Sequence, residues 1–219
     1  MHAQYHTALI RKALEADFTE TALGEVIAAN LGQDALRYQL GNKPHFHCDN
    51  NKIAESLAYV EEEHAAIAAI AGTTAAGADG AQMRAALGHL FHTVQDFYAH
   101  SNYVDLWLES QKGRPRPPAE AIDGLVPGLL GHPGLRTGTF VMWRDLIYYV
   151  PLVGKLARRI YVSPRSHEAM NLDGPERGWK FWYAYAAAYQ RTCAEYQRAV
   201  ATVRTAGGEA ALQAFWGQA

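Results

Sequence analysis

The sequence predicts an all-α fold, and three observations support this prediction. Apolar residues recur at spacings of three and four along most of the chain, which is typical of helices that bury one face. No segment alternates apolar and polar residues as a half-buried strand does. A chain of 219 residues with 49% hydrophobic and 19% charged residues has enough apolar side chains for a sizeable core. We therefore expect a single all-α domain over residues 1–219.

Two short helices are expected at the start of the chain, over residues 5–16 and 19–31. Thr19 can cap the second helix, because its hydroxyl can accept a hydrogen bond from a free backbone N–H of the first turn. Glu20 follows it, and an early acidic residue is favourable at a helix N-terminus.

Two longer helices should follow. The first covers residues 52–71, is rich in alanine, and has Asn50 as its expected cap and Gly72 as its end. The second begins after Asp79 and is expected to continue to Trp107.

The remainder of the chain has a looser pattern. Residues 108–165 contain several prolines and glycines and predict an irregular insertion with a short helix from Ala119. Within it, Trp143 to Ile160 favours a helix kinked near Pro151. A long last helix is expected from Glu176 to Thr205.

Composition excludes several classes of protein. A net charge of −2 gives no overall electrostatic signature of nucleic-acid binding. Two cysteines, Cys48 and Cys193, are too few for a disulfide framework. The first thirty residues contain no apolar core of a secretory signal, which predicts a cytoplasmic protein and leaves export by a signal-independent route as the alternative.

The most informative stretch is LGHLFHTVQDFYAHSNYVDLW, residues 87–107. His92, Asp96 and His100 are four residues apart and so share one face of a helix. A rise of about 1.5 Å per residue separates the two histidines by roughly 12 Å, too far for one ion. We expect two or more metal ions along this face, with Asp96 shared between them. The alternative is a face with ordinary buried histidines.

A second histidine pair lies in KPHFHCDNN. Alternation along an extended segment would place His45 and His47 on the same side. One of them is expected to bind metal while the other supports it by hydrogen bonding. The alternative is a surface histidine pair.

Further candidate ligands are dispersed along the chain. His167 opens SHEAMNLD, where Asn171 lies on the same helix face and Asp173 offers a carboxylate. His6 lies early in the first helix, and Asp34 ends the segment ANLGQD.

Five segments together resemble the Het-C (heterokaryon incompatibility C) family, related to zinc-dependent phospholipases C and single-strand-specific nucleases. They are YHTALIRKAL, AANLGQD, HFHCDN, LGHLFHTVQDFYAHSN and SHEAMNLD, and they extend over about residues 5–185. The resemblance implies a multi-helix metallohydrolase fold of the zinc-dependent phospholipase C type, with two or three divalent ions. The predicted metal ligands are His6, Asp34, His45 or His47, His92, Asp96, His100, His167 and Asp173.

Such a centre would hydrolyse phosphoesters, because divalent ions polarise phosphoryl oxygens and lower the pKa of bound water. Asp34 and Asp96 are the expected catalytic carboxylates, with Asp34 as the candidate general base. Tyr98 and Asn102, from the same histidine-rich segment, are candidates for substrate binding. Zinc is favoured over calcium, since calcium requires six to eight oxygen ligands.

Phospholipid is the preferred substrate class. The segment from Pro127 to Tyr161 combines aromatic, aliphatic and basic residues, which could contact a membrane surface and lipid headgroups; alternatively it packs over the core. Nucleic acid is disfavoured as a partner by the mild acidity of the chain. The alternatives are a single-strand nuclease or phosphatase of the same fold, and a non-enzymatic self-recognition or toxin module with structural metal.

Overall fold

The computed structural model describes residues 1–35, 43–73, 79–139 and 166–219. Outside its helices the described chain has only two isolated β-bridges, Ser101 with Thr137 and Thr139 with Ser166. The all-α prediction is therefore confirmed. The elements in order are α1 (Ala3–Leu14), α2 (Glu20–Gly32), η1 (Pro44–His47), α4 (Ile53–Gly72), α5 (Gly80–His100), α6 (Tyr103–Ser110), η2 (Ala119–Ala121), α7 (Pro127–Leu130), α10 (His167–Met170), η4 (Pro175–Arg177) and α11 (Lys180–Trp216).

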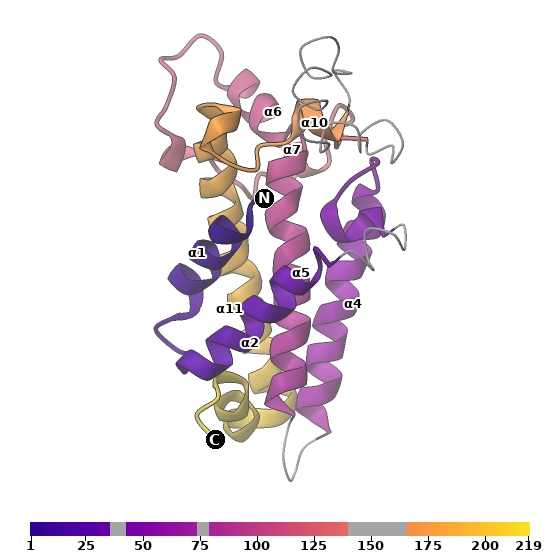
Figure 1. Ribbon diagram of the computed structural model, residues 1–219, viewed down its shortest axis with the longest axis vertical. Helices are drawn as coiled ribbons and strands as arrows, with labels where there is room; N and C mark the ends of the chain where they lie inside the picture. Colours follow the sequence, from indigo (N-terminus) through magenta and orange to yellow (C-terminus); the bar gives the residue numbers. More distant parts are fainter. Residues whose placement is uncertain (36–42, 74–78, 140–165) are drawn as a thin grey trace, which may run out of the picture.

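Helix α5 is the centre of the bundle. It packs against α2, α4 and α11, and α1 completes the side next to α2 (Figure 1). Almost every residue of α5 from Met83 to His100 is buried, including its polar ones. The short elements α6, α7 and α10 gather at one end of the bundle, the end at which the N-terminus also lies (Figure 1). Any site on the last turns of α5 is therefore covered from several sides.

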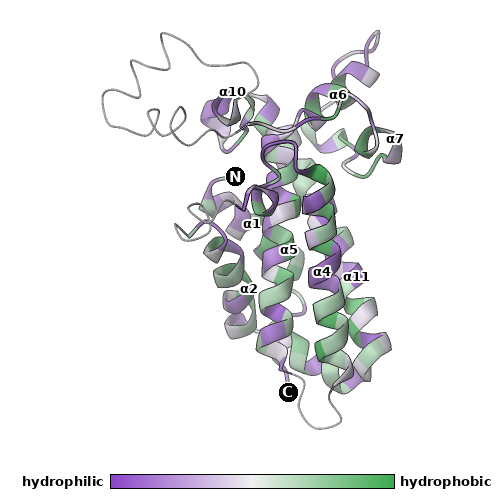
Figure 2. Ribbon diagram, turned by 90° about the vertical axis from the view of Figure 1, so that its right-hand side faces the viewer, coloured by the Kyte–Doolittle hydropathy of each residue, from purple (hydrophilic) through white to green (hydrophobic). Residues whose placement is uncertain are grey.

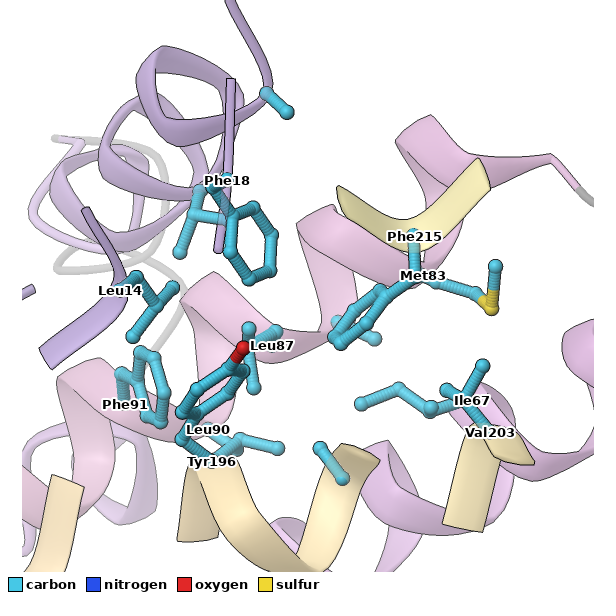
Figure 3. Close-up of a cluster of buried hydrophobic side chains, with 14 of the residues drawn as sticks. Leu14, Phe18, Ile67, Met83, Leu87, Leu90, Phe91, Tyr196, Val203 and Phe215 are labelled. Carbon is cyan, nitrogen blue, oxygen red and sulfur yellow. The ribbon is translucent and has the colours of Figure 1, made fainter. Parts of the chain in front are cut away.

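The main core lies along the middle of the bundle. Leu14, Phe91, Tyr196 and Phe215 bring α1, α5 and α11 together around it (Figure 3). The hydropathy of the residues agrees with this position of the core, because apolar residues run along α4, α5 and α11 where these helices lie side by side (Figure 2). Removal of this apolar surface from water contributes most of the free energy that stabilises the bundle.

Helices α2 and α5 approach each other closely at Gly88. A Cβ atom at this position would lie 2.4 Å from the Val26 carbonyl oxygen and 2.7 Å from the Cβ of Ala29. Backbone atoms cannot yield as a flexible side chain does, so only glycine fits.

We expect Gly88→Ala to destabilise the protein by about 2 kcal/mol or more, because the added methyl group forces two packed helices apart. The measurement is the free energy of unfolding in urea. Gly24→Ala, on α2, is the matched control, because its added methyl group would have no atom within 4 Å. It should stabilise the protein by about 0.5–1 kcal/mol, as expected for alanine in place of glycine in a helix. Equal effects of the two variants would contradict the close packing.

Two helix boundaries differ from the sequence prediction for long-range reasons. The helix expected to reach Trp107 ends at His100, because Ser101 is extended (φ −106°, ψ 167°). The Asn102 side chain accepts from the backbone N–H of Arg136 and donates to the Gly134 carbonyl, which ties this break to a distant loop.

The expected cap Asn50 is also wrong. Asn50 and Asn51 have left-handed φ values of 58° and 56°, and Lys52 is the residue that precedes α4. Asn51 instead pairs with Thr137: its N–H donates to the Thr137 hydroxyl, and its side-chain oxygen accepts from the Thr137 N–H. Thr19 and Asp79 do cap their helices, as predicted, by accepting from backbone N–H groups three residues on.

The last helix starts later and ends later than predicted. It runs from Lys180 to Trp216, with non-helical angles at Gly208 (φ 69°, ψ −163°). The described part of the insertion, residues 111–139, has only the short elements η2 and α7, as an irregular segment should. The helix expected over residues 143–160, and with it most of the basic aromatic segment, lies outside the described residues. No helix in the described ranges is long and apolar enough to cross a bilayer.

Candidate metal centre

The last turns of α5 present one buried polar face. His92, Asp96 and His100 are exposed by only 0%, 1% and 5%. Helix α1 brings His6 to this face, the end of η1 brings His47, and the residues after α2 bring Asp34. Three other segments of the chain therefore meet α5 at this face.

Four ligand atoms form a first group, which we call the Asp34 group: Asp34 Oδ1, His47 Nδ1, His92 Nε2 and Asp96 Oδ2. The two histidine nitrogens are 2.9 Å apart. Asp96 Oδ2 lies 3.0 Å from the His92 nitrogen and 3.2 Å from the His47 nitrogen. Asp34 Oδ1 completes the group at 3.7 Å from His92 and 3.8 Å from His47.

Three of these atoms, those of His47, His92 and Asp96, fit three corners of a tetrahedral ion. Zinc binds histidine nitrogen and carboxylate oxygen at about 2.0–2.2 Å, so neighbouring ligands of one ion lie about 3.3 Å apart. The three distances among His47, His92 and Asp96 are close to this value, and the two distances from Asp34 are longer. Two nitrogens and two oxygens are also the ligand types that zinc-like ions prefer.

A second group of polar atoms lies around the other oxygen of Asp96. His6 Nε2 is 3.2 Å from Asp96 Oδ1. The Met1 amino group lies between Asp96 Oδ1 at 2.5 Å and Asp173 Oδ1 at 2.9 Å. The two carboxylates thus already enclose a cationic group in this structure.

Hydrogen bonds from behind select which nitrogen of a neutral His6 ring carries the proton. The Thr192 hydroxyl donates to the Ala188 carbonyl, so its oxygen accepts from the Gln95 amide nitrogen. The Gln95 carbonyl oxygen is then oriented toward His6 Nδ1, 2.6 Å away, and must accept its proton.

In the neutral ring, the proton on Nδ1 leaves His6 Nε2 with a bare lone pair. This atom is buried without a hydrogen-bond partner and is directed at a carboxylate oxygen. A lone pair and a carboxylate repel each other at 3.2 Å unless a cation or a proton lies between them. The chain itself thus prepares a nitrogen ligand for a cation.

The pKa values of the two histidines on the α5 face, His92 and His100, are shifted in opposite directions. Burial lowers the pKa of His92 to about 4, so its imidazole is neutral and able to bind metal at pH 7. Burial also disfavours the charged form of His100, but the carboxylates of Asp96, Asp49 and Asp173 outweigh it and raise its pKa to about 10.

Both nitrogens of His100 are engaged, Nδ1 with the His47 carbonyl at 2.9 Å and Nε2 with Asp173 at 3.0 Å. His100 therefore lies beside the ligand groups as a hydrogen-bonded cation, and its role as a ligand stays a prediction. Burial opposes ionisation of Asp96, yet the Met1 amino group and the imidazoles of His100 and His92 hold its pKa well below the usual range.

The structure does not bring His45 to the cluster. Residues 44–47 form a 3-10 turn, in which positions two apart point in different directions, so the alternation argument for His45 and His47 is wrong. The His45 ring instead packs on Phe46 and Tyr59.

Tyr98 and Asn102 also lie elsewhere. The Tyr98 hydroxyl donates to the Gly124 carbonyl from another face of α5, and Asn102 holds the loop at Arg136. His167 begins α10, and the placement of its side chain lies outside what the structure describes.

Two residues of the site were not predicted. Gln95 orients His6, and Asp49 lies 3.7 Å from His100 Nδ1. Asp49 carried a signal in the sequence, since it follows the two histidines of KPHFHCDNN, whereas nothing in the local pattern distinguishes Gln95 from other helical glutamines.

Comparison with known proteins places the chain in a family. Residues 2–121 match the family described as VWA7 N-terminal domain, which is more than half of the chain. The chain belongs to this family. The match covers α1 to α6, and with them the Asp34 group and His6. No solved structure matches the chain.

A curated relative from Homo sapiens, von Willebrand factor A domain-containing protein 7, is 37% identical over 87 residues. This alignment spans 39% of the present chain and 9% of the human protein. Both matches overturn the resemblance to the Het-C family, which is therefore wrong, together with the assignment to the phospholipases C.

Proposed function

We propose that this protein binds divalent metal ions, zinc in preference to calcium, and uses them to hydrolyse phosphoesters. The observation that carries the proposal is the approach of His47, His92 and Asp96 to within 3.2 Å of one another, with Asp34 on the open side and the second oxygen of Asp96 facing His6. Catalytic zinc sites keep a position open to water, whereas structural sites are closed by protein ligands. Asp34 is 45% exposed while His92 and Asp96 are almost fully buried, so the group opens to solvent on the Asp34 side.

The residues have distinct parts in this proposal. His47 and His92 would hold one ion, His6 a second, and Asp96 both. When bound, the ions would polarise a phosphoryl oxygen and lower the pKa of a water molecule. Asp34 faces solvent and can accept the proton of that water. The described residues that converge on Asp96 include no serine or cysteine nucleophile, so water is the expected attacking group.

The first experiment measures metal content and hydrolysis together. Protein purified without added ions is analysed by elemental mass spectrometry, stripped with a chelator, and reloaded with Zn²⁺. Each form is assayed with bis(p-nitrophenyl) phosphate, p-nitrophenyl phosphate and p-nitrophenyl acetate. Zinc-dependent turnover of a phosphoester, and not of the acetate, supports the proposal. Bound zinc without phosphoester turnover would contradict it.

That last outcome would favour a second candidate, a metal centre that only stabilises the domain. The supporting observation is that the Asp34 group comes from η1, α5 and the segment after α2, so one ion there would join three segments of the chain. The curated relative is far longer than the aligned part, which is compatible with a module in a larger protein.

Gln95→Leu tests the support of His6. We expect zinc affinity to fall about 10- to 100-fold, because loss of the hydrogen bond to Nδ1 frees the tautomer and the orientation of the ring. Isothermal titration with Zn²⁺ measures the affinity. Gln190→Leu is the control, since Gln190 bonds the backbone at Ile122 and Gly124, away from the ligands. Equal losses of zinc affinity in the two variants would show that the effect does not depend on the hydrogen bond between Gln95 and His6.

A further inference from the structure

A buried row of polar side chains lies behind His6. It consists of Asn30 on α2, Gln95 on α5 and Thr192 on α11, each exposed by 0%. The Gln95 carbonyl oxygen is 2.6 Å from His6 Nδ1 and 3.3 Å from the Asn30 amide nitrogen. The Gln95 amide nitrogen donates to the Thr192 hydroxyl at 3.1 Å, and Asn30 also donates to the Gly88 carbonyl at 3.3 Å. Three helices therefore each contribute one side chain to the support of His6.

The Gly88 carbonyl fixes the orientation of the Asn30 amide. A backbone carbonyl can only accept a hydrogen bond, so Asn30 must turn its NH2 group toward it. The reversed amide would bring two oxygen atoms together with no proton between them, in a place without water to screen their repulsion. The Asn30 amide therefore has one favourable orientation, set by the backbone of α5.

The Asn30 amide in turn fixes Gln95. Because Asn30 presents a donor, Gln95 must present its carbonyl oxygen, and the reversed Gln95 amide would place two NH2 groups face to face. Thr192 imposes no such condition, since a hydroxyl both donates and accepts and its hydrogen rotates. It donates to the Ala188 carbonyl in this structure and could donate to Gln95 instead. Asn30 therefore determines which end of the Gln95 amide faces His6, whereas Thr192 can adapt to either end.

We propose that Asn30 is a positioning residue for the candidate metal centre. Through Gln95 it holds the neutral His6 ring with its proton on Nδ1 and its Nε2 lone pair toward Asp96 Oδ1. The inference rests on the proposed function in one respect, that His6 is a metal ligand. An imidazole binds a cation only through an unprotonated nitrogen, so the other tautomer would direct an N–H group at the ion. Asn30 precedes Asp34 by four residues, so the same part of the chain would serve both ligand groups.

The tautomer with the proton on Nε2 is the competing state. The negative charge of Asp96 favours it, because that proton would point toward Oδ1 at 3.2 Å. Two features oppose it. His6 Nε2 makes no aligned hydrogen bond with the carboxylate, and a bare Nδ1 would lie 2.6 Å from the carbonyl oxygen of Gln95. The position of the proton therefore depends on Gln95 keeping its oxygen toward His6.

The test determines the tautomer of His6 in the metal-free chain, by 15N NMR of the ring nitrogens at pH 9. The original chain should carry the proton on Nδ1. Asn30→Leu keeps the size of the side chain and removes its amide, so Gln95 can reverse and at least about half of His6 should move to the Nε2–H form. Thr192→Val, equally buried and equally conservative in shape, should keep the proton on Nδ1. The ring signals of His64, buried outside the centre, should be the same in all three proteins and establish that they are folded.

Three results would overturn the role of Asn30. They are an Nδ1 proton that persists in Asn30→Leu, equal tautomer shifts in Asn30→Leu and Thr192→Val, and a His6 ring that carries both protons in the original chain at pH 9. Asn30→Ala removes the same amide with a smaller side chain and should give the result of Asn30→Leu if that variant does not fold.

Zinc titration of the same proteins separates this inference from the proposed function. Asn30→Leu should weaken the ion at His6 about tenfold or more, and the ion at the Asp34 group should keep its affinity. A changed tautomer with unchanged affinity at His6 would overturn the link between the tautomer and metal binding. A changed tautomer with no zinc bound even by the original chain would contradict the proposed function and still support the control of His6 by Asn30.

Discussion

Replacing Asp96 by asparagine is expected to abolish zinc binding by this protein. Each oxygen of Asp96 faces a different set of ligands, Oδ2 the Asp34 group and Oδ1 His6. Asparagine keeps one oxygen, places a non-ligating NH2 group at the other position, and removes the negative charge. We expect the affinity for the first ion to fall at least about 1,000-fold, equivalent to about 4 kcal/mol. Zinc-dependent phosphoester turnover should disappear with it.

The measurement is zinc titration followed by elemental analysis of the desalted protein. Asp96 also neutralises the buried amino group of Met1, so its loss is expected to destabilise the apoprotein by about 3–5 kcal/mol. Circular dichroism at low temperature establishes the folded fraction in which binding is compared. Asp105→Asn, a surface residue paired with Lys180, is the control and should bind zinc as the original chain does. Two ions bound by Asp96→Asn with unchanged affinity would exclude Asp96 as the shared ligand.

The sequence predicts the helical architecture because each helix carries its own local signals. The caps Thr19 and Asp79 were predicted correctly, since a capping side chain acts within its own first turn. The break at Ser101 was not, because the residues after it still favour a helix. The break depends on bonds from Asn102 to the loop at Gly134 and Arg136, which lie far along the chain.

The same distinction holds within the site. Helical spacing alone places His92 and Asp96 on one face, because four residues are nearly one turn. His45 was misplaced because the geometry of KPHFHCDNN depends on the 3-10 turn that starts at Pro44, in which alternation does not apply. Gln95 could not be predicted, because its role exists only once Thr192 of α11 lies behind it.

The family assignment failed for a related reason. A histidine and an aspartate four residues apart lie on one face of a helix and can both bind a metal ion in many unrelated proteins. This spacing therefore indicates metal binding and does not identify a family. The family match extends over residues 2–121, a range that also contains the core positions between the ligands. The corrected family leaves the geometry around Asp96 unchanged, and that geometry alone supports the metal proposal.

The second large effect is expected in the core, from Phe91→Ala. Phe91 is fully buried and lies among Leu14, Leu90 and Tyr196 (Figure 3), so its loss creates a cavity that the packed helices cannot close. The expected cost is about 3–5 kcal/mol, a large part of the roughly 5–15 kcal/mol typical of a domain. Urea unfolding in the presence of a chelator measures it, and Trp182→Ala, exposed by 49%, should change stability by no more than about 0.5 kcal/mol.

Phe91 directly precedes His92 on α5 but points into the core, so the variant should keep its zinc ligands. Zinc at about 1,000 times its dissociation constant adds about 4 kcal/mol to the stability of a protein that binds it only when folded. We therefore expect zinc to restore the unfolding midpoint of Phe91→Ala to about that of the metal-free original chain. No stabilisation of either protein by zinc would leave the core result intact and contradict the metal centre. Stabilisation of the original chain alone would show that the core and the metal face of α5 are not independent.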